Sequence, residues 1–139
     1  MIRPVRPPGG FTHLHVHSNF SMLAGTRRVE DLVTAASRCG MESLALTDTD
    51  AMHAVVPFTE ACAEHGVRPI YGAELTGGDG PTFLRAVLLA RNRAGYSEIS
   101  RLVTRRRLDG DFDFGEALAG VSGDVYVLVS HHLLMTRLR

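Results

Sequence analysis

The chain has 139 residues, of which 45% are hydrophobic and 22% are charged, and its formal net charge at pH 7 is zero. This composition is typical of one globular domain with a hydrophobic core, and the balanced charge gives no overall field that would draw the chain to nucleic acid or to a membrane. No apolar run approaches the roughly eighteen residues that a membrane-spanning helix needs, and residues 1–10 lack the apolar segment of a signal peptide. Cys39 and Cys62 have no CxxC spacing and are typical of buried thiols in a reducing cytosol, so we expect a cytoplasmic protein.

Strand-like and helix-like patterns alternate after an extended lead-in over residues 1–10, which is rich in Pro and Gly. Short apolar runs predict five strands, over residues 11–17, 43–47, 68–73, 83–90 and 125–130. Apolar residues at helical spacing predict helices over residues 27–39, 55–65 and 96–106, with a helical turn at 114–118. Thr26 is the expected cap of the first helix, and Gly66 is the expected stop of the second.

Three histidines stand at every second position of the first predicted strand, namely His13, His15 and His17. Alternate side chains of a strand point to the same face, so the three imidazoles would project together. Such a cluster is an ordinary way to hold a transition metal. The alternative is a group of exposed or core histidines without a metal; a row of three favours the metal.

Polar residues also end the next two predicted strands. Alternating strands and helices predict parallel strands with crossover helices, as in an α/β barrel or an open doubly wound sheet. In both architectures, ligands bind at the C-terminal ends of the strands. His15 and His17 end the first predicted strand, Asp48 ends the second and Glu74 ends the third. This pattern favours an α/β metal hydrolase; the alternative is that Asp48 only caps a helix and Glu74 is a solvated loop residue.

Four blocks of the sequence resemble one family, the polymerase and histidinol phosphatase (PHP) domain. They are HLHVHSNFSMLAG, ALTDTDAM, RPIYGAEL and AVLLARNRAGYSEISRLV. The resemblance covers residues 11–108 and points to the version at the N-terminus of bacterial DNA polymerase III alpha subunits and error-prone DNA polymerases, because the last block is specific to that branch. It implies a distorted barrel of seven βα units with two or three metals, commonly zinc or manganese, at the strand C-termini. The chain has about five predicted strands, so residues 11–139 are expected to form the N-terminal two-thirds of such a domain.

The resemblance also implies a ligand set. His15 and His17 match the paired histidines of the family's first motif, and His13 occupies a position that is often acidic or His. Asp48 matches the Asp of a TDH motif. Glu74 matches the Glu of a GAE motif, which in the family can bridge two metals. Asp48 and Glu74 would then be the catalytic carboxylates.

The sequence departs from the family pattern at several positions. Thr49 stands where a ligand His usually follows the Asp, with Asp50 and His53 as the nearest substitutes. Arg85 is the residue nearest to where a later His commonly precedes the apolar run. After the fifth predicted strand, His132 or its neighbouring His is the candidate for a further ligand.

The function that the resemblance implies is metal-dependent phosphoester hydrolysis, with removal of 3′-terminal nucleotides in the polymerase branch. DNA and the other domains of a polymerase would then be the partners, without a membrane. Two alternatives stay open: a stand-alone phosphatase of a small monoester such as histidinol phosphate, and a noncatalytic brace whose metal site has decayed. Four arginines around the end of the third predicted helix are expected to be a solvated helix end rather than a DNA contact; they are Arg101, Arg105, Arg106 and Arg107.

Overall fold

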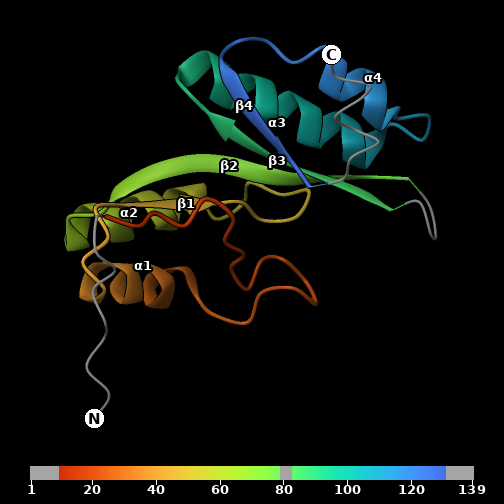
Figure 1. Cartoon of the computed structure of the whole chain (residues 1–139). Coiled ribbons are helices and arrows are strands. Elements are labelled where there is room, and N and C mark those ends of the chain that lie inside the picture. Colours follow the sequence, from red (N-terminus) through yellow and green to blue (C-terminus); the bar gives the residue numbers. More distant parts are fainter. Residues whose placement is uncertain (1–9, 79–82, 131–139) are drawn as a thin grey trace.

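The computed structural model describes residues 10–78 and 83–130 and has a mixed α/β architecture (Figure 1). In chain order the elements are α1 (Val29–Arg38), β1 (Ser43–Leu46), α2 (Val55–His65), β2 (Arg68–Gly77), β3 (Leu84–Ala90), α3 (Arg93–Leu108), α4 (Phe114–Ala119) and β4 (Val125–Val129). No helix in the described ranges has the length and apolar character needed to cross a bilayer.

The four strands form one sheet in the order β1-β2-β3-β4. β1 and β2 pair in parallel, but β2 with β3 and β3 with β4 pair antiparallel. The expectation of parallel strands throughout is therefore wrong beyond β2. β2 ends at Gly77 and β3 begins at Leu84, and so short a connection makes a hairpin, because a parallel crossover needs a dozen or more residues.

The predicted first strand, residues 11–17, is not a strand of the sheet. It runs along β1 instead, where His13 O accepts a hydrogen bond from Ala45 N and Val16 O accepts one from Thr47 N. The two bonded positions are three residues apart on this segment but only two apart on the β1 side, as in a β-bulge. The Thr47 side chain adds bonds to both the N–H and the C=O of Val16. The extra residue changes which side chains share a face.

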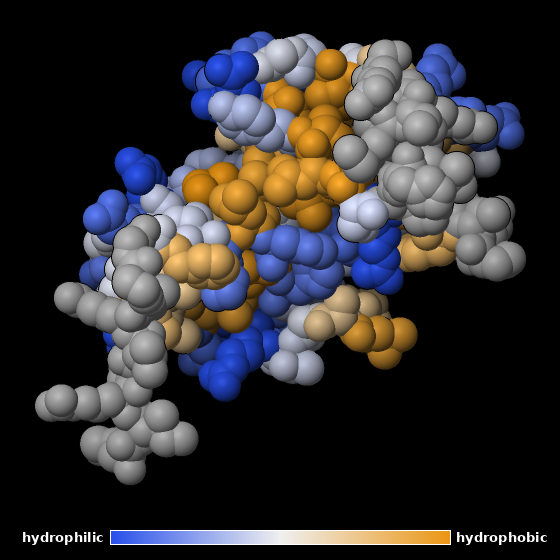
Figure 2. Space-filling model, in the orientation of Figure 1, coloured by the Kyte–Doolittle hydropathy of each residue, from blue (hydrophilic) through white to orange (hydrophobic). Residues whose placement is uncertain are grey.

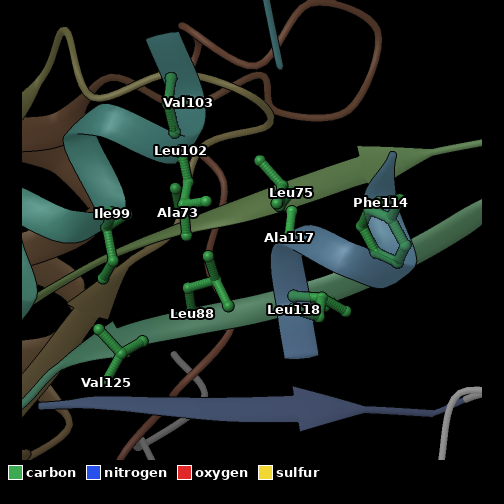
Figure 3. Close-up of a cluster of buried hydrophobic side chains, with 11 residues drawn as sticks. Ala73, Leu75, Leu88, Ile99, Leu102, Val103, Phe114, Ala117, Leu118 and Val125 are labelled. Carbon is green, nitrogen blue, oxygen red and sulfur yellow. The ribbon is translucent and has the colours of Figure 1, made fainter. Parts of the chain in front are cut away.

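Helices cover the two halves of the sheet from opposite sides (Figure 1). α1 and α2 pack together beside β1 in one apolar core that includes Val33, Leu44 and Phe58. α3 and α4 pack on the β2–β4 half in a second core. Figure 3 shows its side chains meeting between the strands and the helices, among them Leu75, Leu88, Ile99, Phe114 and Leu118.

Local sequence signals set some helix ends and not others. α2 ends as expected, because Gly66 adopts the left-handed conformation at φ +66° that a side chain disfavours. The capping role expected of Thr26 is wrong, since α1 begins at Val29 after Arg28 and no side chain caps it. α3 begins three residues earlier than expected, because the Asn92 side chain accepts a hydrogen bond from Gly95 N.

The sheet face turned away from α3 and α4 carries both polar and apolar side chains. Pairing sets Glu74 opposite Val87 and Thr76 opposite Arg85, so alternate residues of β2 and β3 share this face. Figure 2 shows a hydrophobic surface around β4, where Leu128 is exposed. β2 extends past Ala73, and Glu74 consequently lies within the strand rather than after its end.

Candidate metal centre

Three side chains bring potential metal ligands together: His15, His17 and Glu74. One ligand atom from each lies within 4.8 Å of the other two. His15 Nε2 lies 2.9 Å from Glu74 Oε2 and 3.1 Å from His17 Nε2, and His17 Nε2 lies 3.6 Å from Glu74 Oε1. These are the nitrogen and oxygen atoms through which histidine and glutamate bind transition metals.

Two neighbouring elements position the three side chains. His15 and His17 flank Val16, whose side chain packs against the α1–α2 core while its backbone is bonded to Thr47. Glu74 projects from the middle of β2 and is fully buried. Its backbone is tied to the loop after β1, because Glu74 N donates to Asp48 O and Asp50 N donates to Glu74 O.

The Glu74 carboxylate is only half satisfied by the protein. Oε1 accepts a hydrogen bond from the Thr49 hydroxyl at 3.0 Å. Oε2 is buried and accepts no hydrogen bond from any described residue, although His15 Nε2 is close to it. A buried carboxylate oxygen without a partner is costly unless a cation neutralises it. Oε2 lies beside His15 Nε2 and Oε1 beside His17 Nε2, so a divalent ion among these atoms would neutralise the carboxylate.

Burial lowers the pKa of His17 below its ordinary value, although the charge of Glu74 opposes this effect. A lower pKa favours the neutral imidazole, which is the form that binds a metal. Two histidines and one glutamate are the ligand set of several catalytic zinc sites, in which a fourth position is left for water or substrate. The three donors therefore fit one divalent ion.

Asp48 is buried, but its carboxylate is directed at a different part of the structure. Its oxygens accept hydrogen bonds from Ser18 N at 2.7 Å, Ser18 Oγ at 2.7 Å and Ser21 Oγ at 2.6 Å. Ser21 Oγ accepts in turn from Thr49 N. The structure does not bring Asp48 into the group of three, and its contacts hold the loop that follows His17. Metal binding by Asp48 stays a prediction.

The other predicted ligands lie outside this group as well. His13 is exposed, with its ring against Phe11 at a centroid distance of 4.7 Å. Asp50 accepts hydrogen bonds from the backbone and side chain of Thr76. The His53 ring lies 6.5 Å from a phenylalanine ring rather than beside Glu74. His132 falls outside the described residues.

Arg85 lies at the site, although the sequence predicted no role for it beyond its position where the family commonly has a histidine. Arg85 Nη1 lies 3.5 Å from Glu74 Oε1, and the Arg85 guanidinium lies over the Phe83 ring at 5.0 Å. The signal that locates it is non-local, because only the β2–β3 register places Arg85 beside Glu74.

The arginines at the end of α3 also differ from expectation. Arg106 is half-buried, and its Nε donates to Thr76 O, while Arg107 Nε donates to Asp50 O. A solvated helix end is therefore the wrong interpretation for Arg106. These two arginines fasten α3 to β2 and to the loop that follows β1.

The fold and the site together define an α/β domain with a histidine–glutamate group suited to a metal. The chain belongs to the PHP domain family, whose family model matches residues 13–135. It is 38% identical over 122 residues to an error-prone DNA polymerase of Symbiobacterium thermophilum, a match that covers 88% of this chain and 10% of that polymerase. It is also 32% identical over 111 residues to the DNA polymerase III subunit alpha of Borreliella burgdorferi, covering 72% of this chain and 10% of that subunit.

Solved structures share the fold. A protein assigned as a metal-dependent phosphoesterase from Bifidobacterium adolescentis matches with a TM-score of 0.52 and 24% identity, over 81% of this chain and 44% of that one. An amidohydrolase from Chromobacterium violaceum matches with a TM-score of 0.51 and 24% identity, over 81% of this chain and 40% of that one. The expected resemblance to the PHP regions of DNA polymerases is thus confirmed, and the chain spans about a tenth of the length of these polymerases.

Proposed function

We propose that this chain is the PHP domain of a bacterial DNA polymerase of the error-prone or alpha type, and that it binds a divalent ion for phosphoester hydrolysis at DNA 3′ ends. The buried Glu74 carboxylate carries this proposal, because its Oε2 accepts no hydrogen bond from the described residues and lies 2.9 Å from His15 Nε2, while its Oε1 lies 3.6 Å from His17 Nε2. The identity to polymerases supports the DNA context, with other polymerase domains as partners and the bacterial cytoplasm as the location. We further propose that residues 11–139 belong to one PHP unit of the (βα)7 barrel type, preceded by a lead-in.

His15, His17 and Glu74 would hold the ion, either zinc or manganese, both of which accept imidazole and carboxylate ligands. When bound, the ion would act as a Lewis acid on a phosphoryl oxygen and activate water for attack on phosphorus. Thr49 keeps Oε1 of Glu74 oriented through its hydroxyl. Asp48 fixes the loop after His17 and so limits the movement of that imidazole.

A noncatalytic brace is the second candidate, and one observation favours it. Thr49 occupies a position where the family commonly has a ligand histidine, and here its side chain is a hydroxyl that donates to Glu74 instead of an imidazole. A site with three donors holds one ion rather than a cluster. If the site does not catalyse hydrolysis, the domain would support the polymerase only as a structural brace.

Elemental analysis of the purified chain tests the metal site directly. We expect about one zinc or manganese per chain for the wild type and loss of this metal for His15→Ala. His13→Ala is the matched control, because His13 is exposed and lies outside the group. Absence of bound metal after equilibration with excess zinc and manganese would favour the brace.

Nucleotide release from a 3′-labelled single strand tests the activity. The metal-loaded wild type and His13→Ala should release nucleotides, and His15→Ala should not. Turnover of histidinol phosphate without any action on DNA would instead support a small-molecule phosphatase.

A further inference from the structure

Arg85 stands at the edge of the candidate metal centre. Its side chain is about half exposed, at 54%, whereas that of Glu74 is fully buried. Its guanidinium approaches Glu74 Oε1 from the β3 side, while His15 lies by the other carboxylate oxygen. Arg85 and His15, whose side chain is 48% exposed, thus both reach from the carboxylate toward solvent.

A permanent positive charge next to Glu74 affects how a metal binds there. A guanidinium stays protonated at any ordinary pH, whereas an imidazole that binds a metal is neutral. Arg85 is therefore the fixed cation within 4 Å of Glu74 among the described residues. A divalent ion on the same carboxylate would repel the guanidinium at short range. The long, half-exposed Arg85 side chain can move toward solvent without disturbing a core.

A displaced guanidinium would stay near Glu74, because Arg85 is anchored on β3 and contacts the exposed ring of Phe83. Its planar fork of donors matches the oxygens of a phosphoryl group. The substrate of the proposed reaction carries such a group at the point where the ion would act.

We propose that Arg85 is the anion-binding residue of this centre: its guanidinium neutralises Glu74 until a divalent ion takes the carboxylate, and then holds a non-bridging phosphoryl oxygen of the substrate. This inference rests on the proposed function and adds a positioning group to it. According to this proposal, the divalent ion and Arg85 compete for the Glu74 carboxylate. Once the ion is bound, both contact the same phosphoryl group.

Two binding measurements on the whole chain test both halves of the proposal. The first is titration of the metal-free protein with Mn²⁺ by calorimetry, for the wild type and Arg85→Gln. We expect Arg85→Gln to bind Mn²⁺ about tenfold more tightly at low salt, and the difference to shrink at high salt because screening weakens the repulsion. Arg101→Gln is the matched control, since it removes the same charge from the exposed surface of α3.

The second measurement is binding of inorganic phosphate to the Mn²⁺-saturated proteins. We expect Arg85→Gln to bind phosphate about tenfold more weakly than wild type and Arg101→Gln, with Arg85→Lys between them because it keeps the charge and loses the fork. Equal Mn²⁺ constants for wild type and Arg85→Gln within about twofold, or equal phosphate constants, would overturn the proposal. Neither measurement uses turnover, so a wild type that binds Mn²⁺ and phosphate but releases no nucleotides would refute the proposed hydrolysis alone.

Discussion

Replacing Glu74 by Gln should separate the proposed metal-binding role of this residue from a structural role. The buried carboxylate has one oxygen that accepts no hydrogen bond from the described residues, and a buried unsatisfied group of this kind costs about 1–3 kcal/mol. The Gln amide removes the charge, keeps an oxygen for the Thr49 hydroxyl and offers N–H donors to the imidazoles. The ion pair with Arg85 contributes at most about 1 kcal/mol, because the Arg85 side chain is half exposed and its charge is screened by solvent. Without metal, Glu74→Gln should therefore be as stable as wild type or more stable by up to about 2 kcal/mol.

The metal-loaded proteins should differ in the opposite direction. A ligand at a free concentration of about 100 times its Kd stabilises the folded state by about 2.7 kcal/mol, which for a chain of this size raises Tm by roughly 5–10 °C. Wild type should show this rise with zinc or manganese, and Glu74→Gln should not, because an amide is a poor ligand in place of the carboxylate. Thermal unfolding followed by circular dichroism, with EDTA and with metal, measures both effects.

Glu64→Gln is the control, because Glu64 is an exposed carboxylate on α2. It should match wild type in both conditions. A metal-free Glu74→Gln protein that unfolds at least about 2 kcal/mol more easily than wild type would show that the contacts of Glu74 stabilise the fold, contrary to the argument from its unpaired oxygen. Retention of the metal-induced rise in Tm would remove Glu74 from the ligand set.

Three further predictions concern residues around the site and in the core. Asp48→Asn should lower the free energy of unfolding in urea by about 2–4 kcal/mol, because an amide cannot accept all three bonds from the serine backbone and hydroxyls; a loss below about 0.5 kcal/mol would contradict the geometry. Gly25→Ala should cost about 1–3 kcal/mol, because its Cβ would lie 1.9 Å from Ser18 O and the loop must shift; an unchanged urea midpoint would refute this clash. Burial raises the pKa of the Cys62 thiol to about 11, so Cys62 should react with a thiol reagent at pH 8 much more slowly than the half-buried Cys39; equal rates measured by mass spectrometry would show that Cys62 is accessible.

The parts of the fold that local chemistry determines could be predicted from the sequence. α2 spans Val55–His65 as expected, because Gly66 supplies the left-handed residue that ends it. Strand direction is not local in this sense. Nothing within residues 84–90 specifies that β3 pairs antiparallel with β2, since this depends on a short connection and on burial of the β2–β4 half under α3 and α4.

The candidate site shows the same division. Alternate spacing brings His15 and His17 to one side, and the end of the third apolar run locates Glu74 close to them. His13 lies outside the group of potential ligands for a non-local reason. The positions that bond to Ala45 and Thr47 are three residues apart on its segment but two apart on the β1 side. The approach of Arg85 to Glu74 likewise requires the β2–β3 register, which no local pattern encodes.

Removing any bound metal should leave this domain folded. In this respect we expect it to differ from small domains that fold only when a metal binds. Its two larger apolar cores are built by α1, α2 and β1 on one side and by β2–β4 with α3 and α4 on the other, and a smaller cluster joins Ala45, Val87 and Leu89. None of the three candidate ligands belongs to any of these clusters. Arg85 supplies a positive charge to Glu74 without any ion. After treatment with EDTA, the domain should therefore retain its far-ultraviolet circular dichroism spectrum and a cooperative thermal transition. Its Tm should fall only by the amount that the bound ion had contributed. Loss of the spectrum on chelation would mean that the ion holds the two halves together, as in a structural zinc site. Retention of the spectrum would mean that occupancy of the centre can change without unfolding the domain, so that the fold itself does not depend on the ion.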